Sequence, residues 1–146
     1  MSEPVSFHVH GEPAPQGSKT VGRSKAGAAF VREDNPKTEP WRNAVAAAAA
    51  EAMAGRPPLA GPVELEVVFV FGRPRSHYRT GKLAGQLKPR AALYCAKRPD
   101  VDKLVRALGD ALTGVVLVDD ASIVRLRAEK HYGAPGAFVD VREVAA

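Results

Sequence analysis

Alternation of apolar and polar side chains predicts several β-strands along this chain. Val5–His10 and Ser122–Tyr132 alternate as half-buried strands do. Pro62–Gly72 alternates at its start and is rich in β-branched and aromatic residues, so we expect it to be a central strand. Ala28–Glu33 is expected to form a short strand, and Ala137–Val144, after a glycine-bounded turn, to form a hairpin with Ser122–Tyr132.

Two segments have the pattern of a helix instead. The first runs from Thr38, a plausible N-cap, through an alanine-rich stretch of high helix propensity to Gly55. The second follows Pro99 and is expected to end near Gly114. Its apolar residues recur at helical spacing, at Val101, Leu104, Val105, Leu108, Ala111 and Leu112. Strands mixed with two helices predict an α+β fold.

Length and composition limit the possibilities further. The chain has 146 residues with 45% hydrophobic content, enough for the core of one domain, which we expect to span residues 1–146. Cys95 is the single cysteine, which excludes an internal disulfide and a CxxC zinc pair, and we expect an idle thiol. The chain shows no signal peptide and no apolar run long enough to span a membrane, so we expect a cytoplasmic protein with no membrane partner.

The positive charge of the chain is concentrated in one segment. The formal net charge is +5, from 21 basic and 16 acidic residues. Residues 73–98 contain no acidic residue, and without them 13 basic residues face 16 acidic ones. Their eight cations are Arg73, Arg75, Arg79, Lys82, Lys88, Arg90, Lys97 and Arg98. Interleaved tyrosines, glycines and prolines suit a mobile arm that contacts nucleic-acid phosphates and bases, although such a run is often only a solvated surface. A second acid-free stretch, the predicted loop Pro13–Lys25, adds Lys19 and Arg23 as candidate contacts.

Five aspartates gather immediately after this arm, between Lys97 and Asp120. Each has an ordinary structural explanation. Asp100 is placed to cap the second helix and Asp102 lies in its first turn, where a carboxylate is favoured by the helix dipole. Asp102 with Arg106, and Arg106 with Asp110, are spaced to form weak ion pairs on the helix surface.

Their combination favours a metal site. Asp100 and Asp102 flank the junction between loop and helix, where a non-helical step can turn both side chains to one side. Asp119 and Asp120 follow after the chain has reversed beyond the helix. Oxygen ligands from two adjacent elements are typical of an open Mg²⁺ site, which retains waters for substrate phosphates.

The segments DVDKLVRALGDALTG and VDDASIV together resemble the signature of the RusA family of Holliday-junction resolvases. That signature is an Asp-x-Asp motif followed by Leu, then Asp-Ala-Leu, then a paired Asp-Asp before a strand. The resemblance implies a homodimer with a small mixed sheet packed with two main helices. It also implies Mg²⁺-dependent nicking of branched, four-way DNA in recombination and repair, with Mn²⁺ as a substitute and 5′-phosphate products. Asp100, Asp102 and Asp120 match the essential acidic residues of the family.

This chain departs from the family pattern at two positions. The family typically has an Asn after the second aspartate and an essential Lys four residues after it, where this chain has Lys103 and Arg106. Arg106 keeps the charge and can bind a phosphate through two hydrogen bonds, whereas Lys103 is the alternative for the role of the lysine. Two other functions stay open from sequence. One is a noncatalytic nucleic-acid-binding protein in which the aspartates only brace the helix, and the other is a nuclease of the same fold that acts on other branched DNA.

Overall fold

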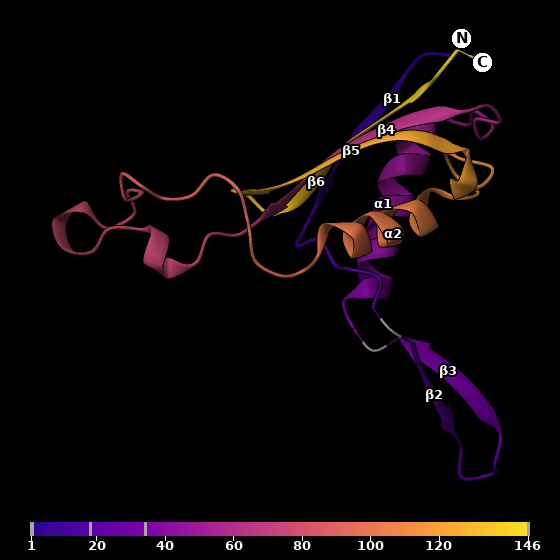
Figure 1. Ribbon diagram of the computed structural model, residues 1–146, viewed down its shortest axis with the longest axis horizontal. Coiled ribbons are helices and arrows are strands. Elements are labelled where there is room, and N and C mark those ends of the chain that lie inside the picture. Colours follow the sequence, from indigo (N-terminus) through magenta and orange to yellow (C-terminus); the bar gives the residue numbers. More distant parts are fainter. Residues whose placement is uncertain (1, 18, 34, 146) are drawn as a thin grey trace.

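The computed structural model describes residues 2–17, 19–33 and 35–145, with side chains outside 19–21 and 30–33 (Figure 1). Its main sheet has four strands in the order β1-β6-β4-β5. These are β1 (Val5–His10), β6 (Gly136–Glu143), β4 (Val63–Phe71) and β5 (Ile123–Tyr132). β4 is parallel to β5 and antiparallel to β6. The mixed sheet, together with two helices, confirms the predicted α+β fold and the central position of β4.

Both helices cover the same face of this sheet. β4 buries alternate residues on that face, including Leu65 and Phe69. α1 (Thr38–Met53) places a residue in the core at nearly every turn, and α2 (Val101–Leu112) buries Leu104 and Leu108. The helical spacing of apolar residues therefore identified the buried face of α2, except at Val101, which is exposed at the first position of the helix. Within the described residues, no helix lies on the opposite face of the sheet (Figure 1).

The predicted hairpin between the last two strands is wrong. β5 and β6 are consecutive in the chain, but β4 lies between them and pairs with both. The short connection crosses the end of β4, where the amide of Gly133 donates to the carbonyl of Phe71 at 2.9 Å. β4 is the most apolar strand, so burial favours giving it a neighbour on each side.

The predicted loop Pro13–Lys25 is also wrong in part. It contains β2 (Lys19–Arg23), which pairs with β3 (Ala29–Glu33) in a separate two-stranded sheet. This hairpin projects away from the body of the molecule (Figure 1). The strand β3 confirms the short strand expected from Ala28–Glu33.

Thr38 does not cap the first helix as predicted. Lys37 occupies the N-cap position and Thr38 is the first helical residue. The Thr38 side chain is buried and its hydroxyl donates to the carbonyl of Pro15 at 2.6 Å. The hydroxyl thus anchors the chain that leads into β2, a long-range contact that no local pattern reveals.

Asp140 on the open face of the sheet makes stability depend on pH. Burial on its own disfavours the charged carboxyl, but hydrogen bonds from Ser6 and Arg142 outweigh it and lower the pKa of Asp140. A lowered pKa stabilises the fold above the unfolded-state pKa, and this contribution is lost as pH falls through the folded-state pKa. We expect Asp140→Asn to lower the free energy of unfolding by about 1 kcal/mol at neutral pH. Urea denaturation should show this difference shrinking below about pH 4. A difference that does not change with pH would contradict this assignment.

Candidate functional site

The candidate site begins at the N-terminal end of α2. Asp100 occupies the N-cap position with extended backbone angles (φ −70°, ψ 140°), so a non-helical step separates it from Asp102 in the first turn. The carboxylate of Asp100 makes no capping hydrogen bond and lies 3.8 Å from Nζ of Lys103. Both aspartates are exposed. The side chain of Asp100 therefore does not cap the helix, although the residue occupies the N-cap position.

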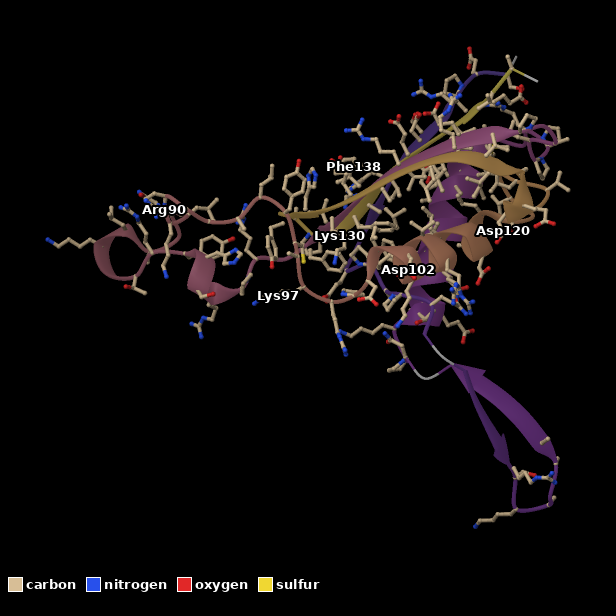
Figure 2. All side chains as sticks on the ribbon, viewed as in Figure 1. Arg90, Lys97, Asp102, Asp120, Lys130 and Phe138 are labelled. Carbon is tan, nitrogen blue, oxygen red and sulfur yellow. The ribbon has the colours of Figure 1, made fainter. Side chains whose placement is uncertain are left out.

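Three residues in a row follow one face of α2, two of them predicted site residues. Asp102, Arg106 and Gly109 are four and three residues apart, which places them on the same side of the helix. A Cβ atom on Gly109 would lie 3.5 Å from Cβ of Asp120, so Asp120 packs onto this face. Gly109 comes seven positions after Asp102, which is a rise of about 10 Å along the helix axis. Figure 2 shows Asp102 near the start of α2 and Asp120 beyond its end, whereas Phe138 belongs to the other side of the sheet.

Negative charge is crowded at the C-terminal end of this row. Asp119 precedes the short 3-10 helix η3 (Asp120–Ser122) and accepts a hydrogen bond from the amide of Ala121 at 3.2 Å. That bond, and a further one with Asp120, lower the pKa of Asp119. The pKa of Asp120 is raised, first by its hydrogen bond with Asp119, then by burial and by the charges of Asp119 and Asp110. A divalent cation would relieve this crowding of carboxylates.

The carboxylates fit a hard cation by their chemistry, but they do not yet form one closed ligand set. Among the described histidine, cysteine, aspartate and glutamate side chains, no group of three is arranged to hold a metal ion. Asp100 and Asp102 lie at one end of α2, and Asp119 and Asp120 lie at the other. The structure thus divides the predicted ligands between the two ends of α2.

A hollow opens beside the N-terminal aspartates. It has a volume of about 430 Å³ and is lined by Pro15, Asn35, Arg98, Pro99, Asp100 and Lys103. The chain before β2 forms one wall, held by a hydrogen bond of 3.0 Å from the amide of Gln16 to the carbonyl of Lys103. The hollow therefore sets two cations beside a carboxylate, an arrangement suited to a phosphate that also approaches a metal.

The basic segment 73–98 leaves the sheet after β4 and projects as an arm (Figure 1). It contains the short helices η1 (Arg75–His77) and η2 (Gly81–Leu83). Backbone hydrogen bonds from Arg79 to Gln86 and from Lys88 to His77 fold the arm back on itself. Its exposed cations are Arg75, Lys82, Lys88, Arg90, Lys97 and Arg98, and Arg79 is half-buried.

Arg73 differs from the other cations of the arm. Its Nη1 donates to the carbonyl of Ala92 at 2.7 Å, and its guanidinium lies 5.5 Å from the centre of the Tyr132 ring. These contacts join the two ends of the arm to each other and to β5. Arg73 therefore serves the attachment of the arm, a role that its sequence neighbourhood did not reveal.

Replacing Arg73 by Ala should loosen this attachment. Loss of a charged hydrogen bond is expected to raise amide exchange rates in the arm by about tenfold, a loss of about 1.4 kcal/mol in local stability. Hydrogen exchange read by mass spectrometry measures this directly. Arg75→Ala removes an exposed cation of the same arm and is the matched control. Equal exchange in the two variants would contradict the attachment role.

The carboxylate of Asp110 pairs with another helix instead of with a residue of α2. The ion pairs expected within α2 are absent from the part of the chain that the structure describes, where Asp110 instead lies 3.8 Å from Arg42 of α1. Arg42 was not predicted as a partner of Asp110, and no local spacing links it to α2.

The two cations predicted outside the arm belong to the β2–β3 hairpin. Arg23 is exposed there, and the side chain of Lys19 lies outside the described residues.

None of the described helices is both long enough and apolar enough to cross a membrane.

Comparison with known proteins identifies the family. Over 145 residues the chain is 31% identical to the uncharacterized protein YqaN of Bacillus subtilis (strain 168), covering 97% of this chain and 98% of that protein. The family model for endodeoxyribonuclease RusA matches residues 10–142, which include the arm, both helices and all five clustered aspartates. The chain therefore belongs to the RusA endodeoxyribonuclease family.

Proposed function

We propose that this protein is a Mg²⁺-dependent, structure-selective endodeoxyribonuclease that resolves four-way DNA junctions by paired nicking, in recombination and repair. The observation that carries the proposal is one face of α2, on which Asp102 and Arg106 are exposed and against which Asp120 packs at Gly109. A basic arm leads directly into the start of that helix. Carboxylates for a metal and cations for a polyphosphate thus lie on consecutive parts of the chain.

Asp100 and Asp102 at one end of α2, and Asp119 and Asp120 at the other, would supply carboxylate ligands for divalent metal, with Mn²⁺ able to replace Mg²⁺. A bound divalent ion supplies Lewis-acid chemistry, neutralising charge on the scissile phosphate and acidifying a water. Carboxylate oxygens are the ligands that Mg²⁺ prefers. The pKa of Asp120 is raised by its hydrogen bond with Asp119, then by burial and by the charges of Asp119 and Asp110, so carboxylates are crowded here.

Arg106 is proposed to bind the scissile phosphate. It is exposed, it lies between Asp102 and Asp120 along the helix, and none of the ion pairs among described residues involves it. Its planar guanidinium can donate two parallel hydrogen bonds to a phosphate. Lys103 contacts the carboxylate of Asp100 instead, so we assign it to orienting that side chain and to the adjacent hollow.

The substrate geometry favours a homodimer. A four-way junction is close to two-fold symmetric and must be cut on two strands, and a C₂ dimer presents two equivalent sites. The arm, with Arg23 and Lys19 of the β2–β3 hairpin, is proposed to hold the junction backbone. Because the two projections leave the body in different directions, each can follow a separate part of a branched substrate (Figure 1).

A panel of DNA substrates tests this function. The purified protein is incubated with a four-way junction, a flap and a linear duplex, in Mg²⁺, in Mn²⁺ and in EDTA. We expect symmetric paired nicks in the four-way junction, only when metal is present. Binding without cleavage in every condition would instead indicate a noncatalytic DNA-binding protein, and preferred cleavage of the flap would replace the junction as substrate.

A further inference from the structure

Lys130 holds the loop that leads into the candidate site. Its ammonium donates to the carbonyl of Lys97 at 2.5 Å and to the carbonyl of Pro99 at 2.7 Å. Lys130 lies on β5 beside the buried Phe69 of β4, so its side chain belongs to the face of the sheet that the helices cover. Pro99 directly precedes Asp100, and Figure 2 shows Lys97 and Lys130 near the start of α2.

The same residue also joins the returning end of the arm. The amide of Cys95 donates to the carbonyl of Lys130 at 2.9 Å, and the amide of Tyr132 donates to the carbonyl of Leu93 at 2.9 Å. The chain returning from the arm therefore pairs with the outer edge of β5. Through its backbone Lys130 binds the arm, and through its side chain it binds the loop before Asp100.

The hydrogen-bond acceptors of the Lys130 ammonium indicate that this side chain tethers residues 97–99 to β5. A lysine ordinarily pairs with a carboxylate or points to water, yet no ion pair in the described part of the chain involves Lys130. Its ammonium is instead directed at two backbone carbonyls, two residues apart. Without it the exposed carbonyl of Lys97 and the half-buried carbonyl of Pro99 would lose a charged donor. Pro99 has no N–H group of its own to hold the loop in place.

We propose that Lys130 is a positioning residue that sets Asp100 and Asp102 for metal binding and couples them to the arm. The inference rests on the proposed nuclease function for its catalytic consequence. Lys130 acts through the loop and not on the substrate.

Two substitutions of Lys130 test the tether. Lys130→Met keeps the length of the apolar stem and removes the ammonium, whereas Lys130→Arg keeps charge and donors. Arg127→Met is the matched control, because Arg127 is an exposed cation on the other face of the same strand. Each variant is examined by single-turnover junction cleavage, by junction affinity in EDTA, and by hydrogen exchange of residues 96–104.

The expected pattern separates positioning from binding. Lys130→Met should cleave on the order of 10- to 100-fold more slowly, as is usual when the support of a metal ligand is lost, with unchanged junction affinity. Exchange in residues 96–104 should accelerate in this variant alone. Lys130→Arg should restore most of the cleavage rate and the protection, and Arg127→Met should match the wild type.

Specific outcomes would overturn the inference. If Lys130→Arg cleaved as slowly as Lys130→Met while retaining normal exchange, the amine itself would be needed for chemistry and the positioning role would fail. If the wild type cleaved no substrate, the proposed nuclease function would fail, and hydrogen exchange would still judge the tether. Unchanged hydrogen exchange of residues 96–104 in Lys130→Met would then reject the tether.

Discussion

Asp102→Asn is expected to abolish cleavage of a four-way junction while leaving junction binding intact. Asp102 is an exposed carboxylate at the start of α2, on the face that also carries Arg106. Loss of one metal ligand removes several kcal/mol of transition-state stabilisation, so kcat should fall on the order of 1000-fold or more. Because the side chain is exposed and replaced by one of equal size, the fold should be unaffected. Single-turnover cleavage in Mg²⁺ and binding in EDTA measure the two effects.

Glu51→Gln provides the matched control for this experiment. Glu51 is also an exposed carboxylate on a helix, but it lies near the end of α1, away from the row on α2. Its neutralisation should leave cleavage at the wild-type rate. Undiminished cleavage by Asp102→Asn would show that this carboxylate is only a helix-dipole partner.

Neutralising Arg75, Arg79 and Lys82 together should weaken junction binding and flatten its dependence on salt. Each cation that contacts a phosphate releases counterions on binding, so loss of three contacts should reduce the slope of log Kd against log salt by about three. The three residues lie on the arm, where Arg75 and Lys82 are exposed and Arg79 is half-buried. Anisotropy titrations of labelled junction at several salt concentrations measure this slope.

A double substitution on the sheet controls for the loss of positive charge itself. Arg125→Gln with Arg127→Gln removes two exposed cations from the sheet face opposite the helices. This variant should keep the wild-type salt slope. An unchanged slope in the arm variant would remove the arm from the DNA interface and leave the β2–β3 hairpin as the contact to examine.

Local patterns predicted the elements that depend on local physics. The apolar spacing from Val101 to Leu112 matches the helix found there, and Gly114, with φ of +86°, follows its end as expected. The strand expected over Pro62–Gly72 is β4, with buried residues at alternating positions. Each of these depends on side chains a few residues apart, which is the range over which periodicity carries information.

Contacts between distant segments were beyond the reach of those patterns. A glycine-bounded turn after β5 suggested a hairpin, but the order of strands depends on burying β4, which lies more than fifty residues earlier. In the same way, Arg42 with Asp110 and Lys130 with Pro99 join residues from different elements. Nothing in the sequence near these residues marks their partners.

The residues of the candidate site could be predicted from the sequence, but their arrangement in space could be predicted only in part. The sequence indicated that Asp100 and Asp102 come at the junction of arm and helix, and the backbone angles at Asp100 agree. Packing of Asp120 against Gly109, which places it on the same helix face as Asp102, depends on how the chain turns after α2. That turn is set by burial of Val116 and Leu117, which periodicity does not specify.

Binding of Mn²⁺ tests most directly the central claim that carboxylates from both ends of α2 hold the metal. Electron paramagnetic resonance titrations of Mn²⁺ would compare the wild type with Asp102→Asn, Asp120→Asn and the control Glu51→Gln. We predict that the wild type and Glu51→Gln bind Mn²⁺ with equal affinity and that both aspartate variants bind it much more weakly. Wild-type affinity in either aspartate variant would contradict the claim.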